Sequence, residues 1–334
     1  MNLLITGGCG FLGTNLVKHL ASRRPEYHLT VFDLLTYAGA KSNIKSLISK
    51  GSVAFVQGDV CYPDQVDTVL EYGIDMVINL AAETHVDRSI LDPGDFIRTN
   101  VFGVQVLLDC CRRKSVPVLH ISTDEIYGPA PEGVSFREDD AFSPSSPYAA
   151  SKASADLLIL AAVRTYGQEA MIIRPVNNLG PYQYPEKLIP LFVDRLTRGL
   201  PVPVYGDGKQ TRYWLHVDDF CAAIELAIEG FTRGECYNLS SQDDISNIDL
   251  TRQLIEIIGC KQKLIRHVDD RPGHDRRYAI DGTKFVNRFG WLPQFDLDRA
   301  LRNTVKWYQD NPGWLKSRKT KEFEEYFDKQ YGSL

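Results

Sequence analysis

The segment LLITGGCGFLGTNLV, residues 3–17, constrains the fold of this chain more than any other stretch. An apolar strand runs into Gly7, Gly10 and Gly13 at three-residue intervals and then into a helix. In this setting the first glycine permits a tight turn, and the second lets backbone approach a pyrophosphate at the positive helix end. The third permits close helix–sheet packing. The segment predicts a dinucleotide-binding unit at the start of the chain.

The same alternation of strand and helix continues along the first half. Segments with helical periodicity, 11–22 and 96–113 among them, separate several short apolar runs. These runs lie at 3–6, 29–32, 54–56, 76–80, 118–122 and 171–173. Strands that alternate with helices form parallel sheets covered on both faces. The predicted fold class is therefore α/β, a Rossmann-like doubly wound parallel sheet with a smaller C-terminal α/β substrate domain.

A change of composition near residue 175 suggests the domain boundary. Beyond it come Pro- and Gly-rich loops such as GLPVPVYGDGKQ, followed by helical patterns. We predict a NAD-binding domain over 1–175 and a substrate-binding domain over 176–334 that closes over the carboxyl edge of the sheet, with some interleaved segments. The charged tail, 315–334, reads as a solvated terminal helix.

Composition narrows the possible partners. The chain has 334 residues, 43% of them hydrophobic, and 38 basic and 43 acidic residues are interspersed to a net charge of −5, with no basic stripe for nucleic acid. No stretch approaches the roughly 20 apolar residues that span a bilayer, and the start lacks a signal-peptide layout, so we expect a cytoplasmic protein. Neither the seven cysteines nor the seven histidines show metal-ligand spacing, so no metal is expected.

Acidic and small residues after the next strands complete the predicted cofactor site. Asp33 closes the second strand, 20 residues past Gly13, where a carboxylate accepts hydrogen bonds from ribose hydroxyls and repels a 2′-phosphate, which favours NAD over NADP. A strand-end turn aspartate is the alternative. Asp59, Ala81 and Ala82 follow later strands, although Gly-Asp also makes turns and Ala-Ala also begins helices.

A tyrosine and a lysine four residues apart indicate the catalytic end. In SPSSPYAASKASADLL, Tyr148 and Lys152 lie on one face of a helix that begins at Ser and Pro. A nearby lysine favours the phenolate and so lowers the pKa of a tyrosine, as does a helix N-terminus. Tyr148 could then accept a substrate hydroxyl proton at neutral pH. The alternative for such a pair alone is an ordinary surface helix.

Two adjacent carboxylates, Asp124 and Glu125, follow the apolar run VPVLHIS in the segment STDEIYG. Oxidation of a sugar hydroxyl acidifies the hydrogen on the neighbouring carbon, so one carboxylate could remove it while the other protonates a leaving hydroxyl one carbon further on. The product would be the sugar minus water. A solvated pair, or one that caps the next helix, is the structural alternative.

Tyr148 and Lys152, about 140 residues after the glycine fingerprint, resemble the catalytic pair of the short-chain dehydrogenase/reductase superfamily. With STDEIYG and SSPYAASK, the chain is similar to the nucleotide-sugar dehydratases of its extended group, over nearly its whole length. Further matching segments are LTYAG, HVDRSI, TNVFG, YGPAP, PYQYPEKLIP, PVYGDG and DRPGHDRRYAID. The segments most resemble members that act on dTDP-glucose, while the base and the exact sugar stay open.

The resemblance implies roles at matching positions. Tyr148 would take the C4 hydroxyl proton, Lys152 would tune it and hold the nicotinamide ribose, and Thr123 would hydrogen-bond the same hydroxyl. Asp124 would expel the C6 hydroxyl as acid, and Glu125 would act as base at C5. The complete predicted cofactor set is Gly7, Gly10, Phe11, Leu12, Gly13, Asp33, Thr36, Asp59, Val60, Ala81, Ala82, Tyr148 and Lys152. The predicted substrate set is His85, Asn178, Glu186, Lys187, Tyr205, Arg212, Asn247, Arg271 and His274.

Three positions depart from the pattern that the resemblance implies. Tyr213 stands where an Asp is usual, Leu179 where a Tyr is usual, and Thr84 where a Ser is usual. Tyr213 and Leu179 flank the expected pockets, so they bear on which nucleotide or sugar is accepted.

Rival functions share the fold. A nucleotide-sugar 4-epimerase or decarboxylase would also begin with Tyr and NAD, but it has no need of an acid–base pair after the strand. A non-catalytic NAD-binding regulator could lose Tyr148 or Lys152 freely. The resemblance also implies a nucleotide-diphosphate sugar as substrate and a homodimer formed by the helices around 100–111 and 151–162, whose apolar faces would equally suit a helix–sheet contact.

Overall fold

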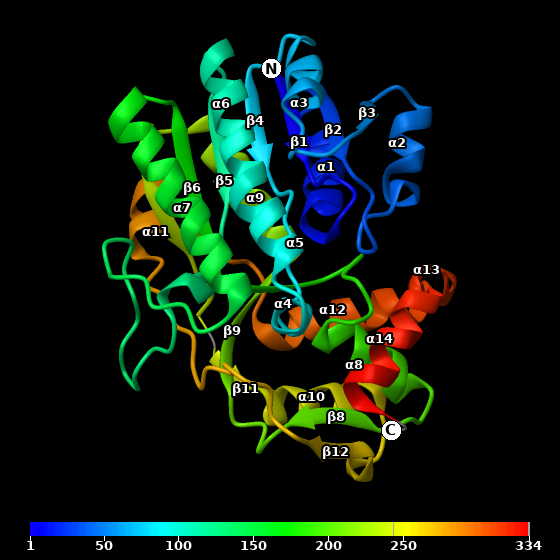
Figure 1. The fold of residues 1–334 in the computed structure, drawn as a ribbon. Helices are drawn as coiled ribbons and strands as arrows, with labels where there is room; N and C mark the ends of the chain where they lie inside the picture. Colours follow the sequence, from blue (N-terminus) through cyan, green and yellow to red (C-terminus); the bar gives the residue numbers. More distant parts are fainter. Residues whose placement is uncertain (243, 333–334) are drawn as a thin grey trace.

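A parallel sheet of seven strands organises the larger lobe (Figure 1). Its strands are β1 (Asn2–Thr6), β2 (His28–Asp33), β3 (Val53–Gln57), β4 (Met76–Asn79), β5 (Val118–Ile121), β6 (Ala170–Pro175) and β10 (Cys236–Leu239). The order across the sheet is β10-β6-β5-β4-β1-β2-β3, with every neighbouring pair parallel. The computed structural model describes residues 1–242 and 244–332. The direction of winding reverses between β1 and β4, which is where a doubly wound sheet opens a crevice for ligands.

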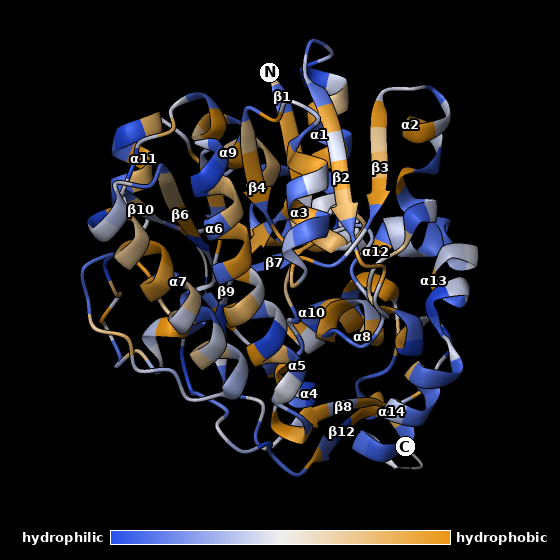
Figure 2. Ribbon diagram, turned by 45° about the horizontal axis from the view of Figure 1, so that its top comes forward, coloured by the Kyte–Doolittle hydropathy of each residue, from blue (hydrophilic) through white to orange (hydrophobic). Residues whose placement is uncertain are grey.

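Helices cover both faces of this sheet, as predicted. One face carries α3 (Pro63–Leu70), α6 (Val104–Lys114) and α7 (Pro147–Tyr166), and the other carries α1 (Phe11–Arg23), α9 (Val217–Glu229) and α11 (Thr283–Phe289). Successive strand residues point to opposite faces. In β1, Leu3 and Ile5 accordingly join the core beneath α1 and α9, whereas Leu4 joins the core beneath α6 and α7. The strands are apolar along most of their length (Figure 2).

Short elements lie at the edges of this lobe, and the last of them carries the predicted catalytic residues Asp124 and Glu125. They are η1 (Lys41–Ile44), α2 (Lys45–Ser49), α4 (Val86–Leu91), α5 (Gly94–Phe96), the π-helical turn η2 (Ile97–Gly103) and the 3-10 turn η3 (Asp124–Tyr127). The turn η3 follows β5 directly and is tied to the sheet by a buried network. Arg174 donates to the Tyr127 hydroxyl at 2.6 Å and to Asp156 at 2.8 Å, and Tyr127 donates to Asn238 of β10 at 2.9 Å.

The smaller lobe has its own sheets and core. Its strands are β7 (Asn177–Leu179), β8 (Val202–Tyr205), β9 (Thr211–His216), β11 (Asp244–Ser246) and β12 (Ile265–Val268), in sheets of order β11-β9-β7 and β12-β8. Its helices are α8 (Leu188–Thr197), α10 (Asn247–Ile258), η4 (Gln262–Leu264), α12 (Leu297–Asp310), α13 (Pro312–Arg318) and α14 (Lys321–Tyr331). Apolar side chains of α8, α10 and α12 form a separate core here.

The second half of the chain also contributes to the larger lobe. Strand β10 pairs with β6 from Cys236 to Leu239, and α9 packs against α1. Some interleaving of the two domains was expected. The segment after residue 175 in fact supplies a whole strand, β10, and covering helices to the larger lobe. The division at residue 175 stays a prediction of domain organisation.

The terminal helix differs from the expectation of a solvated tail. Phe323 and Tyr326 of α14 are buried, because its aromatic residues recur at helical spacing and pack onto the smaller lobe and onto α4. Thr320 caps the helix by accepting the Phe323 N–H at 3.3 Å. Within residues 1–242 and 244–332, no helix combines the length and the apolar character that a membrane crossing requires.

Candidate active site

The glycine turn between β1 and α1 shows why each glycine is needed. Gly7 has φ +66°, and a Cβ there would lie 2.7 Å from the Ala81 nitrogen. A Cβ on Gly13 would collide with the Gly7 carbonyl oxygen, so helix and turn can approach only through glycine. A Cβ on Gly10 would meet only that carbonyl oxygen, at 3.4 Å, and would otherwise project into free space. Gly10 therefore keeps open a cradle at the N-terminus of α1.

Asp33 ends β2 beside this cradle. Its carboxylate accepts the Cys9 N–H at 2.8 Å and the Leu35 N–H at 2.7 Å. Burial raises its pKa, while the two backbone hydrogen bonds oppose that shift. Each carboxylate oxygen accepts more than one hydrogen bond, so this fixed group can also receive hydroxyl donors from the pocket.

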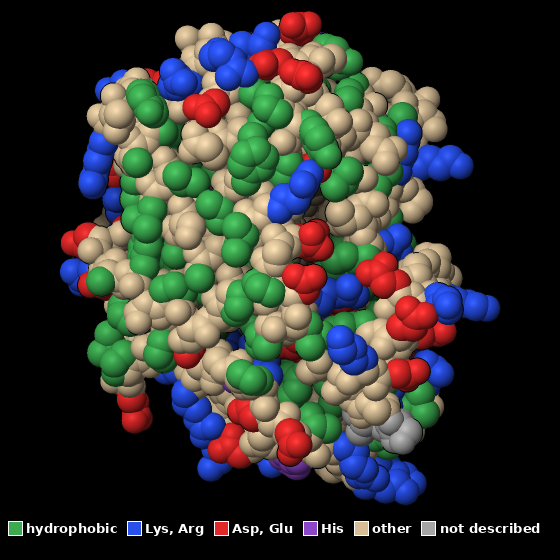
Figure 3. All heavy atoms as spheres, viewed as in Figure 1, with side chains coloured by type: hydrophobic (Ala, Val, Ile, Leu, Met, Phe, Trp, Pro, Cys, Tyr) green, Lys and Arg blue, Asp and Glu red, His purple; other side chains and the backbone are tan. Residues whose placement is uncertain are grey.

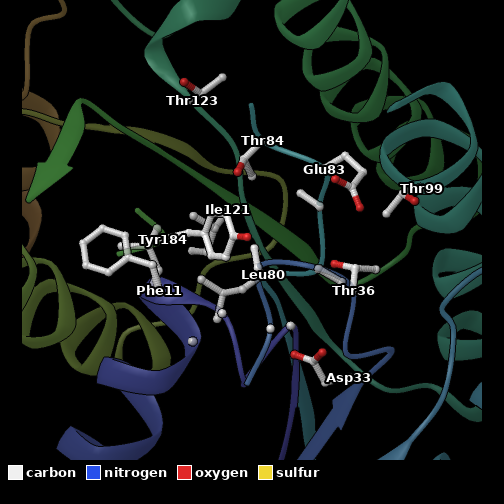
Figure 4. A pocket seen from close by; sticks show the side chains of 18 of the residues that line it. Phe11, Asp33, Thr36, Leu80, Glu83, Thr84, Thr99, Ile121, Thr123 and Tyr184 are labelled. Atoms are coloured by element: carbon white, nitrogen blue, oxygen red, sulfur yellow. The ribbon is translucent and has the colours of Figure 1, made fainter. Parts of the chain in front are cut away.

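A single pocket at the carboxyl end of the sheet is lined by all thirteen residues of the predicted cofactor set. Figure 4 shows Phe11, Asp33 and Thr36 around it, with Thr123 at the far end. The lining also includes Glu83, Thr84 and Thr99, which the sequence analysis did not single out as cofactor residues. Burial raises the pKa of Glu83 to about 7, with Asp95 and Glu186 adding to the effect. In the sequence, the only sign that Glu83 lines this pocket is that it directly follows Ala81 and Ala82, which were predicted to line the cofactor site.

Tyr148 lies in the first turn of α7, where Ser146 caps the helix by accepting the Ala149 N–H at 3.1 Å. Burial raises the pKa of Tyr148, the charge of Glu125 adds to this, and a side-chain hydrogen bond with Thr123 opposes it. Lys152, which was expected to lower this pKa, is not among the groups that shift it, because its ammonium is directed to the end of β5.

Lys152 is bound to the end of β5. Its Nζ donates to the Ile121 carbonyl at 2.7 Å and lies 3.1 Å from Nε2 of His120. Burial lowers the pKa of Lys152 to about 8, and the charge of Asp156 opposes that shift. His120 is fully buried, with Nδ1 2.9 Å from the Asn79 side-chain nitrogen. His120 thus fixes the position of Lys152, a role that the scattered histidines of the sequence did not indicate.

The two carboxylates of η3 have distinct surroundings. Burial raises the pKa of Asp124 to about 7, the charge of Glu125 adds to the shift, and Thr123 donates to Asp124 Oδ1 at 3.2 Å. Burial also raises the pKa of Glu125, but Arg271, Arg212 and Lys187 hold it down by their positive charge. The pair can therefore divide into a protonated acid and a charged base.

A second pocket adjoins the first and is lined by all nine residues of the predicted substrate set. Glu125, Asn178, Glu186 and Lys187 line both pockets, so the two meet beside η3. Asp124 is not among the lining residues of either pocket. Three cationic side chains, Arg212, Arg271 and Lys187, give the second pocket the charge that a diphosphate requires.

Several polar atoms around the second pocket have no hydrogen-bond partner within the described residues. They are Oε2 of Glu125, Oδ1 of Asn178, Nε of Arg271 and Nε1 of Trp214. Buried polar groups are normally paired, and unpaired ones mark places where a ligand or water belongs. The pocket therefore offers both acceptors and donors to a polar ligand.

Side chains from α4 and α14 support this pocket, and the sequence analysis missed most of them. Asp87 accepts Arg271 Nη1 at 2.6 Å and the Tyr205 hydroxyl at 2.8 Å, while Gln330 donates to Tyr205 at 2.8 Å. Tyr331 of α14 lines the pocket itself. The aromatic spacing of the tail was the signal that could have revealed this contact.

Arg88, next to Asp87, connects the lobes. It donates to Glu186 at 2.8 Å and to Glu322 at 3.1 Å, and its guanidinium stacks over Tyr37 and Tyr326. These contacts join the β2 loop, α4, the loop before α8 and α14 around the two pockets.

The departures Tyr213 and Leu179 do not line either pocket. Leu179 is fully buried in the core of the smaller lobe, and Tyr213 of β9 packs against the core beneath α9. Thr84 lines the first pocket, and its carbonyl accepts Lys187 Nζ at 2.7 Å. A different ligand preference therefore has no direct origin in Tyr213 or Leu179.

Comparison with known proteins gives consistent matches. The family described as GDP-mannose 4,6 dehydratase matches residues 4–304. A dTDP-glucose 4,6-dehydratase of Streptomyces antibioticus is 46% identical over 320 residues, which cover 94% of each chain.

Solved structures show the same likeness. The dTDP-glucose 4,6-dehydratase of Streptomyces venezuelae, crystallised with NAD and dTDP, has a TM-score of 0.92 and 42% identity, covering 95% of this chain and all of its own. The UDP-glucose 4-epimerase of Thermus thermophilus, in complex with NAD, has a TM-score of 0.86 and 28% identity, covering 93% of this chain and all of its own.

Proposed function

Since the chain belongs to the GDP-mannose 4,6-dehydratase family, we propose that it is a NAD-dependent nucleotide-sugar 4,6-dehydratase that converts dTDP-glucose to dTDP-4-keto-6-deoxyglucose. It is a hydro-lyase of the extended short-chain dehydrogenase/reductase group. The dehydratases named for dTDP-glucose are 38% to 46% identical to it, against 28% for the epimerase, which favours dehydration over epimerisation.

The observation that carries the proposal is the position of Asp124 and Glu125. They lie beside the junction of the two pockets, where burial raises the pKa of Asp124 to about 7, while three cations oppose the rise in the pKa of Glu125. An epimerase has no use for such a pair, because its substrate loses no hydroxyl. Removal of water needs both groups.

The first pocket suits NAD. The cradle at Gly10 leaves room for a pyrophosphate at the N-terminus of α1, and Asp33 presents a buried carboxylate to a ribose. Lys152 would hold the nicotinamide ribose at the other end. When bound, NAD supplies the hydride acceptor for C4 and the hydride donor for C6.

The side chains at the junction perform the proton chemistry. Tyr148 takes the proton of the C4 hydroxyl, and Thr123 hydrogen-bonds the same hydroxyl. Glu125 then removes the proton at C5, which the new ketone has made acidic. Asp124 protonates the C6 hydroxyl, which leaves as water. Glu125 finally returns its proton to C5.

The second pocket would hold the nucleotide diphosphate. Arg271 and Arg212 offer planar guanidinium groups that match phosphate oxygens, and Lys187 adds a third cation. Asp87 and Tyr205 keep Arg271 in position before the ligand arrives.

We further propose a cytoplasmic homodimer. Ile97 and Phe102 of η2 and Leu157 and Tyr166 of α7 are each at least 54% exposed. Apolar side chains gather on the face over α6 and α7 (Figure 3). Such a patch suits a two-fold helix contact. Light scattering should give twice the chain mass, and Leu157→Asp should lower it to one chain mass if this face forms the interface.

The activity is tested by incubating the protein with dTDP-glucose and, separately, with UDP-glucose. Mass spectrometry should reveal a product lighter by one water from dTDP-glucose, with NAD added if it is lost in purification. Loss of water from UDP-glucose alone would change the nucleotide, and an unchanged mass with both sugars would contradict the proposal. Tyr148→Phe should abolish turnover and serves as the inactive control.

A further inference from the structure

The proposed reaction accounts for every hydrogen of the substrate, but it leaves two protein side chains in a changed protonation state. Hydride leaves C4 and returns to C6, and Glu125 takes a proton from C5 and gives it back. Tyr148, however, keeps the proton of the C4 hydroxyl, whereas Asp124 has given one to the departing water. Before the next turnover, Tyr148 must lose one proton and Asp124 must gain one.

Solvent access to these two groups is restricted. Asp124 is 2% exposed and Tyr148 is 8% exposed. The side-chain hydrogen bond of Asp124 in the described part of the chain runs to Thr123, itself buried. A proton that reaches Asp124 from Tyr148 therefore has a short internal route available.

The hydrogen bonds around Thr123 have the polarity that such a route requires. The Glu125 backbone N–H can only donate, and it donates to Thr123 Oγ1 at 3.3 Å. The Thr123 hydroxyl proton points to Asp124 Oδ1 at 3.2 Å. A hydroxyl accepts two hydrogen bonds and donates one, so one lone pair of Thr123 remains for the Tyr148 hydroxyl.

We propose that Thr123 is the proton relay of this enzyme, returning the proton from Tyr148 to Asp124 after each turnover. The inference rests on the proposed dehydratase function. The O–H bond of Tyr148 breaks as its proton joins Thr123 Oγ1, and the former Thr123 proton joins Asp124 Oδ1. Tyr148 becomes a phenolate, Asp124 becomes a carboxylic acid, and Thr123 is unchanged.

Burial raises the pKa of Tyr148, so the transfer requires that the bound cofactor lower it. A tyrosine that serves as base at neutral pH must have a pKa near neutrality once the cofactor is bound. Burial raises the pKa of Asp124 to about 7, so the carboxylate can take the proton from such a phenol without a large uphill step. An aspartate with its ordinary pKa near 4 would take this proton only against a difference of about three pKa units.

The test compares the first turnover with later ones in the loaded enzyme. Water loss from dTDP-glucose is followed by rapid quench and mass spectrometry in the parental protein, Thr123→Val, Thr123→Ala and Thr123→Ser. In Thr123→Val the ratio of first-turnover rate to steady-state rate should rise by about 10- to 100-fold over the parental ratio, since Asp124 must then be recharged from solvent. Thr123→Ser keeps the hydroxyl and should keep the parental ratio.

Thr123→Ala should show an intermediate ratio, because the space left by the side chain can admit a water that relays the proton. Thr123→Ala also provides the comparison with the parental protein if Thr123→Val does not fold. Equal loss of first-turnover and steady-state rates in both variants would overturn the relay and leave Thr123 as a group that only holds the C4 hydroxyl. Absence of water loss in the parental protein would overturn the proposed function as well.

Discussion

The cofactor pocket and the nucleotide pocket of this protein are built in different ways. The first is shaped by backbone: Gly7, Gly10 and Gly13 form its floor and Asp33 ends a strand beside it, all within one βαβ unit. The second is shaped by charged and aromatic side chains from α4, β8, β9, α10, the loop after β12 and α14, tied together by contacts such as Asp87 with Arg271.

The difference shows how each pocket can tolerate change. A backbone cradle is sensitive to a single added methyl group, which either collides with the chain, as at Gly13, or occupies the space left for the ligand, as at Gly10. A pocket held by ion pairs and hydrogen bonds loses affinity in steps, because each contact can be removed without disturbing the fold.

Substitutions at the junction between the pockets should have the largest effect on activity. Asp124→Asn with Glu125→Gln should lower water loss by about 10²- to 10⁴-fold, because the acid and the base are both removed. Hydride removal from C4 should continue in part, since Tyr148 and Lys152 are intact. Mass spectrometry measures water loss, and the absorbance of reduced nicotinamide measures oxidation. Water loss at near the parental rate would refute these roles.

The backbone cradle is tested by two matched glycine substitutions. Gly13→Ala should destabilise the protein by about 3 kcal/mol, because its Cβ collides with the Gly7 carbonyl oxygen and helix α1 must shift. Gly10→Ala should leave stability within about 0.5 kcal/mol and instead weaken NAD binding, since its Cβ enters open space. Urea unfolding and NAD titration distinguish the two, and equal destabilisation by both would contradict the cradle.

The dependence of the free energy of unfolding on pH should reveal the raised pKa of Asp124. Its pKa rises from 3.8 to about 7 on folding, so the folded protein holds this proton more tightly than the unfolded chain. The resulting stabilisation is complete below pH 4 and is lost as pH rises to about 7. Between pH 5 and 7, the free energy of unfolding of the parental protein relative to Asp124→Asn should fall by about 2 kcal/mol.

The histidines do not disturb that measurement. Burial lowers the pKa of His85 and of His274 to about 4, so both favour stability as pH rises from 4 to 6.5. This contribution is the same in the parental protein and in the variant and cancels in their difference. A difference that stays constant between pH 5 and 7 would contradict the raised pKa of Asp124.

The smallest effect is expected from the side-chain support of the nucleotide pocket. Asp87→Asn removes the charge that holds Arg271, and it should raise the KM for dTDP-glucose about 10-fold, equivalent to ~1.4 kcal/mol. NAD affinity should not change. Asp298→Asn, which breaks an exposed pair with Arg302 on α12, is the control. An equal change in both variants would show that Asp87 acts only through overall stability.

Local pattern explains which parts could be predicted from the sequence. The glycine turn, the strand ends and the helix with Tyr148 and Lys152 each depend on neighbours within a few residues. The structure confirms these elements, and all thirteen predicted cofactor residues line one pocket. The substrate residues were found only through resemblance to whole segments, because no short pattern connects Asn178 with Arg271. Their roles stay predictions.

Contacts between distant segments account for what was missed. His120 reads as one more scattered histidine, yet it fixes Lys152 because β5 and α7 lie side by side in the fold. The tail reads as charged and solvated, yet α14 covers Asp87 and Tyr205 with Tyr326, Gln330 and Tyr331. Such pairings depend on tertiary packing, which periodicity along the chain does not record.

Strand β10 has a consequence for how the protein is made. A ribosome that has released residues 1–175 has delivered six strands of the sheet, but β6 still has an open edge. The partner of that edge, and the Asn238 that accepts from Tyr127 of η3, come more than sixty residues later. The nascent chain must therefore shield an unfinished edge while the smaller lobe begins to emerge, and a fragment cut at residue 175 would carry that edge permanently.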